Sequence, residues 1–180
     1  MTTSTPTKKF MRTMLVLLAL AGATFFTAAC DYIEKTMDAN AIETVLEKDA
    51  KAGNIYLDSS SATRYLSSMN ARVSNMRIID LSDCPSEFQI AYVAHVGAWQ
   101  KQLIVAKEIK TFDDRYNSFS GFFEAFLRGM VFDFGISKEC AEELRIIKEH
   151  ESEALNAISS TWNKVLAVAI KYGVNVTKYQ

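Results

Sequence analysis

The sequence predicts an all-α fold: an antiparallel helical bundle of about four main helices plus a short phenylalanine-rich helix. Three observations lead to this fold class. Pro85 is the only proline after Pro6, so few positions are barred from a helix interior. The helix formers Ala, Glu, Lys and Leu are abundant. Apolar residues recur at spacings of three and four along several segments, which is the period of one helix face.

The first two helices are expected before Pro85. The first ends near Gly53, and its apolar face comprises Ile42, Val45, Leu46 and Ala50. The serines at 59–61 can cap the second helix, because a serine side chain accepts a hydrogen bond from a free N–H group of the first turn. The apolar positions of that helix are Ala62, Tyr65, Leu66, Met69, Val73, Met76 and Ile79.

Two longer helices are expected after Pro85. A proline in the first turn, with Glu87 beside the positive end of the helix dipole, predicts a third helix that runs to about Lys110. Its core-facing positions are Phe88, Ala91, Tyr92, His95, Trp99, Leu103 and Ala106. Ser137 is expected to cap a final helix that ends at Gly173. The buried stripe of this helix comprises Leu144, Ile147, Ala154, Ile158, Trp162, Val165 and Ala169.

A phenylalanine-rich segment separates these two helices. Residues 112–134 hold seven of the eleven phenylalanines, and glycines divide them, so we expect one short helix at about 118–131. Its apolar face could be a candidate binding surface, a lid over an apolar pocket or a surface that touches the bilayer. This face comprises Phe119, Phe122, Phe123 and Phe126. Alternatively, the same rings close the end of the bundle core, because a continuous apolar face is usually buried.

The first thirty residues have the features of a bacterial export signal. Three basic residues precede an uncharged apolar stretch. The stretch ends in Thr27-Ala28-Ala29-Cys30, which resembles the lipobox of bacterial lipoproteins, with Thr27 where the pattern favours Leu. The resemblance implies cleavage before Cys30 and attachment of lipid to its thiol. Residues 1–29 would then be a lipoprotein signal peptide, 30–38 a lipidated tether and 39–180 the helical bundle domain.

A lipid anchor at Cys30 would hold the chain on the periplasmic side of a membrane. Several acyl chains give a stable anchor, because each buried methylene contributes about 0.8 kcal/mol. Asp31 resembles the sorting signal that retains enterobacterial lipoproteins in the inner membrane, and it slightly favours that membrane. Two alternatives stay open. One is an ordinary secretory signal cut after Ala29, and the other is an uncleaved transmembrane anchor, for which the apolar stretch is short.

Two cysteines follow Cys30 in the sequence, Cys84 and Cys140. In an oxidising periplasm a disulfide between them is favoured, and it would stabilise the fold by about 4 kcal/mol. Because both lie in the first turn of an expected helix, the bridge requires the third and last helices to run roughly parallel. Alternatively, the two thiols are buried separately and pack as small apolar groups.

Composition and motifs exclude several function classes. Without the three basic residues of the signal, 17 of the 20 remain against 21 acidic residues, a formal charge of −4, which gives no electrostatic reason to bind nucleic acid. No segment has the spacing of a metal, phosphate, haem or nucleophile motif, so no cofactor, metal site or catalytic residue is predicted.

The histidines and the acids near the phenylalanines are expected to be structural. We expect His95 to be a hydrogen-bonded core residue rather than a haem or metal ligand, and His150 to lie on the surface. The acids are expected to be solvated or to cap helices, although a converging pair would suit acid-base catalysis. These acids are Asp113, Asp114, Glu124 and Asp133.

Two runs of the mature chain resemble small uncharacterised helical proteins secreted by bacteria. They are Cys84-Pro85-x-x-Phe88-x-x-Ala91-Tyr92-x-x-His95-x-x-Ala98-Trp99 and Thr161-Trp162-x-x-Val165-x-x-x-Ala169-x-x-Tyr172-Gly173. The resemblance implies a helical fold and no activity or ligand. With the anchor, the expected function is a lipid-anchored periplasmic helical module that binds a protein or envelope component and is not an enzyme. The alternative is a small apolar ligand-binding protein with a cavity under the segment 112–134, and an enzyme comes third.

Overall fold

The computed structural model describes residues 34–53, 61–116 and 138–179. Four α-helices occupy most of these ranges: the N-terminal helix at 34–53, α2 (Ala62–Arg77), α3 (Ser86–Arg115) and α5 (Lys138–Lys171). A 3-10 turn, η1 (Thr177–Tyr179), follows α5. These ranges contain no strand, so the all-α helical bundle expected from the sequence is confirmed.

The helices begin and end largely where local signals predict. The hydroxyl of Ser61 caps α2 by accepting from the backbone N–H of Arg64 at 3.3 Å. Gly173 follows α5 with a φ of +86°, a backbone conformation that a side chain would strain. The third helix is longer than expected and reaches Arg115 rather than about Lys110. Its apolar stripe continues through the buried Phe112, and an ion pair between Lys110 and Asp114 supports its last turn.

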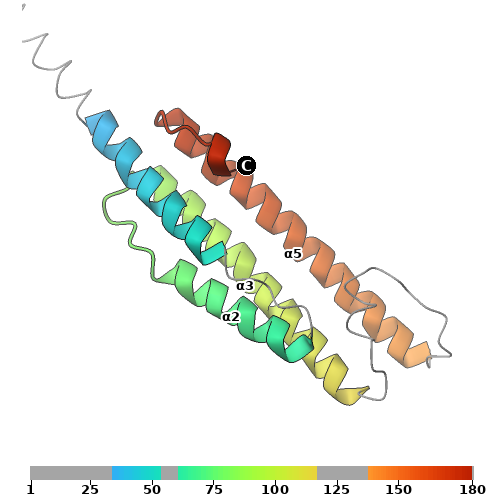
Figure 1. Ribbon diagram of the computed structural model, residues 1–180. Helices are drawn as coiled ribbons and strands as arrows, with labels where there is room; N and C mark the ends of the chain where they lie inside the picture. The colour runs from blue at the N-terminus through green and yellow to red at the C-terminus, as the bar shows by residue number, and fades with distance from the viewer. Residues whose placement is uncertain (1–33, 54–60, 117–137, 180) are drawn as a thin grey trace, which may run out of the picture.

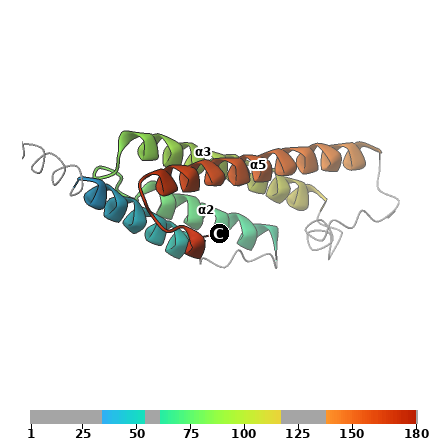
Figure 2. The ribbon, with the colours of Figure 1, turned by 90° about the horizontal axis from the view of Figure 1, so that it is seen from above.

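The two longest helices lie side by side and run antiparallel (Figures 1 and 2). An ion pair between Glu87 and Lys171 joins the start of α3 to the end of α5. At the opposite end of the pair, Arg115 Nη1 lies 2.8 Å from Glu143 Oε1. Figure 1 also shows α2 along α3 and the N-terminal helix, coloured blue to cyan, beside the first half of α3.

Two apolar clusters make up the core of the described ranges. The first joins the N-terminal helix, the start of α3, the end of α5 and the residues that follow α5, and its fully buried side chains include Ile42, Leu46 and Phe88. The second joins α2, the second half of α3 and the first half of α5 around Met69 and Phe112. Trp99 packs against both clusters, so it marks their junction.

The predicted disulfide between Cys84 and Cys140 is wrong. Neither cysteine forms a disulfide, and both are buried, Cys84 in the first core cluster and Cys140 in the second. Because α3 and α5 run antiparallel, the starts of these helices lie at opposite ends of the pair, which keeps the two thiols apart. Each therefore packs as a small apolar group. Burial raises the pKa of Cys84 to about 11, so it carries a neutral thiol at pH 7.

Candidate functional site

A cleft of about 480 Å³ opens where the two core clusters meet. All four helices and the 3-10 turn contribute to its walls. Its polar and charged lining residues are Asp49, Arg72, His95, Ser159 and Lys178, and its apolar and aromatic ones are Ala50, Gly53, Trp99, Leu155, Ile158, Trp162 and Tyr179. Residues far apart in the sequence therefore converge on one concave surface.

Asp49 brings a carboxylate into the core from the N-terminal helix. It is only 4 % exposed, and its Oδ1 accepts a hydrogen bond from the Tyr92 hydroxyl at 2.7 Å. Burial raises the pKa of Asp49, and both the bond from Tyr92 and the charge of Arg72 oppose that rise. The expectation that Ala50 faces the core is wrong, because Ala50 is exposed. The spacing in the sequence does indicate the burial of Asp49, because it lies seven residues after Ile42 and therefore on the same helix face.

Arg72 reaches the same place from α2. Its Nη1 donates to the carbonyl of Gly53 at 3.3 Å, and its Cζ lies 3.7 Å from the centroid of the Trp99 ring. The glycine permits this approach, because a Cβ at position 53 would lie 3.1 Å from Nη1. The Nε of Arg72 is buried and has no hydrogen-bond acceptor. Burial lowers the pKa of Arg72, and the charge of Asp49 partly offsets this.

His95 lies in the core between α3 and α5. It is 2 % exposed, and its Nε2 accepts a hydrogen bond from the indole N–H of Trp99 at 3.1 Å. Its Nδ1 lies 3.0 Å from the hydroxyl of Thr161, which itself donates to the carbonyl of Ala157. The Nδ1 atom therefore carries the proton. Burial, aided by the charge of Arg72, lowers the pKa of His95 to about 4, so the ring is neutral at pH 7. The prediction of a hydrogen-bonded core histidine is confirmed.

The segment after α5 folds back and closes one wall of the cleft. The indole N–H of Trp162 donates to the carbonyl of Tyr179 at 3.3 Å. The Lys178 ammonium donates to Glu43 at 2.7 Å and to Glu47 at 3.2 Å, both on the N-terminal helix. The two Lys178 contacts join residues more than a hundred positions apart, so no local sequence pattern could have revealed them.

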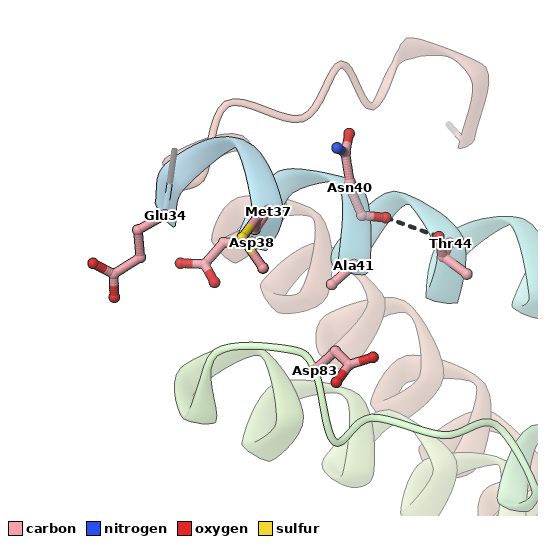
Figure 3. Close-up of a pocket in the computed structure, with 7 residues that line it drawn as sticks. All are labelled: Glu34, Met37, Asp38, Asn40, Ala41, Thr44 and Asp83. Carbon is pink, nitrogen blue, oxygen red and sulfur yellow. Dashed lines mark hydrogen bonds between the residues drawn. The ribbon is translucent and has the colours of Figure 1, made fainter. Parts of the chain in front are cut away.

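A second hollow of about 730 Å³ lies at the other end of the N-terminal helix (Figure 3). Glu34 and Asp38 line it from the helix, and Asp83 lines it from the segment before α3. Figure 3 shows the side chains of Glu34 and Asp38 pointing the same way, away from the helix axis. Within the described ranges, no group of three or more His, Cys, Asp or Glu side chains is arranged to hold a metal ion.

Most of the other residues singled out from the sequence lie outside the described ranges. This holds for Cys30 and Asp31, for the acids Glu124 and Asp133, and for the candidate binding surface made by Phe119, Phe122, Phe123 and Phe126. His150 is described and exposed, as expected, and its Nδ1 lies 2.9 Å from Glu108 Oε2. The helices of the described ranges are each too short or too polar to span a bilayer.

No protein-family model, curated protein or solved structure matches this chain. What the cleft can bind therefore follows from its own residues. It combines two indole rings, a neutral imidazole, a buried carboxylate and a guanidinium. Such groups can hold and orient a ligand through hydrogen bonds and through contact with ring faces.

Proposed function

We propose that this chain is a lipid-anchored helical module on the periplasmic side of a bacterial membrane, where it binds a protein or another component of the envelope. The anchor is supported by the lipobox-like sequence that ends in Cys30, and Asp31 favours the inner membrane. The described helical body begins at Glu34, four residues after Cys30. Four residues span at most roughly 14 Å, so the anchor would hold the body beside the bilayer.

The observation that carries the binding role is the cleft among the four helices. Ligand sites are typically concave, have volumes of roughly 300–1,000 Å³ and combine apolar or aromatic walls with a few polar groups. The cleft has a volume of about 480 Å³, and Trp99 and Trp162 line it together with Arg72. Its size and its lining both suit a bound group rather than a surface irregularity.

The state of the polar groups supports binding rather than catalysis. Both ring nitrogens of His95 are engaged by neighbouring side chains, and the ring is neutral. One carboxylate oxygen of Asp49 holds the Tyr92 hydroxyl. A general base needs a lone pair that faces the substrate. The lone pair of His95 Nε2 already accepts from Trp99, and Asp49 is almost fully buried. They fix the shape of the cleft instead.

A small ligand is a second candidate, because the cleft is large enough to hold one. The sequence suggested a cavity under the segment 112–134. Of the phenylalanines there, Phe112 is described, and it is buried in the second core cluster. A small ligand in the described structure would instead lie in the cleft beside Trp99. The proposed surface of Phe119, Phe122, Phe123 and Phe126 stays a prediction.

Localisation tests the anchor. Wild-type protein and a Cys30→Ser variant would be expressed in a bacterial host, and membrane and soluble periplasmic fractions would be compared. We expect the wild type in the membrane fraction and the variant in the soluble fraction, because the thiol is the lipid attachment point. Mass spectrometry of the mature N-terminus would show the acyl mass. Equal partitioning of the two proteins would refute the anchor.

Site-directed crosslinking tests the recognition role. A photoreactive amino acid at Ser159, which lines the cleft, is compared with one at Ser160, which is also exposed on α5 but does not line the cleft. We expect one specific envelope component to crosslink at position 159 and not at position 160. The same products from both positions, or none from either, would contradict recognition in the cleft.

A further inference from the structure

The guanidinium of Arg72 lacks a full set of hydrogen-bond acceptors within the cleft. Its guanidinium lies on one face of the Trp99 ring and donates to the Gly53 carbonyl, yet its Nε has no acceptor. A buried donor without an acceptor is unfavourable, so a ligand that accepts hydrogen bonds from the guanidinium of Arg72 is favoured. Burial also lowers the pKa of Arg72, which means that its positive charge is incompletely balanced in the protein alone.

The other residues that line the cleft are of two kinds. Some are apolar, and others are polar groups that already have a partner within the protein. Trp162, Ile158 and the half-exposed Leu155 line the side that α5 contributes. By contrast, Asp49 is almost fully buried and holds the Tyr92 hydroxyl, so it offers a ligand little accessible acceptor surface.

The sign of the ligand's charge follows from the same groups. An incoming cation would meet Arg72, which already occupies the face of the Trp99 ring. An incoming anion would meet the donors of Arg72. Guanidinium groups bind carboxylates well, because their parallel N–H groups match the two carboxylate oxygens.

We propose that the cleft binds a carboxylate carried at the end of a small apolar body. The carboxylate pairs with Arg72, and the apolar body lies against Trp162 and the aliphatic side chains of α5. This inference deepens the proposed function by naming the chemistry that the cleft accepts, and it rests on the cleft being the recognition site. It does not depend on the lipid anchor.

The chain has a built-in reporter for this binding. Its two tryptophans, Trp99 and Trp162, both line the cleft, so tryptophan fluorescence comes entirely from the proposed site. Phenylpropionate would be titrated into the full-length chain in mild detergent, beside phenylpropanamide and phenylpropylamine, which differ from it only in the head group. We expect saturable quenching or a spectral shift with the acid, and affinities at least about tenfold weaker for the amide and the amine.

Variants locate the carboxylate. Arg72→Met should weaken phenylpropionate binding at least about tenfold, because the variant loses the charge-assisted hydrogen bonds to the carboxylate. Arg64→Met, an exposed change on the same helix, should leave the affinity unchanged. Gly53→Ala provides an independent variant if Arg72→Met fails to fold, because its Cβ would lie 3.1 Å from Nη1 and would shift the guanidinium by a few tenths of an ångström. It should also weaken binding, and circular dichroism would check the fold of each variant.

Each outcome decides between stated alternatives. Tighter binding of the amine, equal binding of all three probes, no binding of the acid, or an affinity that is unchanged in both Arg72→Met and Gly53→Ala would overturn the inference. N-acetyl-alanyl-phenylalanine separates the two sources of such a carboxylate: tighter binding than phenylpropionate indicates a peptide C-terminus, and weaker binding a free organic acid. If the acid fails to bind but crosslinking at Ser159 captures an envelope component, the ligand class is wrong and the proposed function stands.

Discussion

Acid should destabilise this protein through His95. The ring is 2 % exposed, and its environment lowers its pKa to about 4 from an ordinary value of 6.5. Between these two values the unfolded chain binds a proton that the folded protein excludes. Above about pH 6.5 this residue therefore has no pH-dependent effect on stability. Stability falls as the pH drops towards 4, and the loss is complete below that pH.

The size of the loss follows from the two pKa values. Each pH unit between 6.5 and about 4 corresponds to about 1.4 kcal/mol, which gives a loss of about 3 kcal/mol. This is a large share of the roughly 5–15 kcal/mol that stabilises a typical domain. Asp49 acts in the opposite direction, because its pKa is raised and folding therefore favours its protonation as the pH falls. A comparison with a His95 variant separates the two contributions.

The assay is urea unfolding, followed by circular dichroism at several pH values between about 7 and 4. We expect His95→Gln to be less stable than the wild type at neutral pH, because it loses the bonds to Trp99 and Thr161. The difference should shrink by about 3 kcal/mol at the acid end, because the variant has no imidazole to protonate.

His150→Gln provides the matched control. His150 is exposed, and its hydrogen bond with Glu108 raises its pKa, so its contribution is present at low pH and is lost as the pH rises. This variant should keep the acid-induced loss that His95 causes. A stability difference between wild type and His95→Gln that stays constant from neutral to acid pH would refute a buried, neutral imidazole.

Three further predictions follow from single contacts. Tyr92→Phe removes the donor to Asp49 and should lower the free energy of unfolding by about 1–3 kcal/mol in urea, and an unchanged midpoint would contradict the bond. A reductant should leave the melting temperature unchanged, and Cys84 and Cys140 should react with a thiol reagent only on unfolding; a reductant-sensitive melt would indicate a disulfide. Gly173→Ala should cost about 1 kcal/mol in thermal unfolding, because φ is positive there, and no shift would contradict that geometry.

The helices were predictable because their signals are local. The cap at Ser61, the proline before α3 and the glycine after α5 each act within a few residues, and the structure has a helix end at each of them. The end of α3 was placed too early. Phe112 was assigned to the segment that follows the helix, whereas it belongs to the apolar stripe of α3.

The cleft was only partly predictable. His95 and Trp99 were expected on one face of α3, and Trp162 on the buried stripe of α5, and the structure brings these rings together. Asp49 was missed because charged residues are rarely buried unless they are paired, and its partner Tyr92 lies 43 positions away. The role of Arg72 was not predicted either, because its contacts with Gly53 and Trp99 join distant positions of the sequence.

By itself, the sequence determined the helical fold class, most helix ends and most of the inward-facing positions of the helices, because capping, backbone conformation and apolar spacing are decided within a few residues of the chain. Only the tertiary structure decided which faces meet. The antiparallel packing of α3 on α5 separated Cys84 from Cys140, and the return of the chain after α5 placed Lys178 against Glu43. Contacts between distant segments depend on how whole helix surfaces pack, and that information is not contained in any one segment.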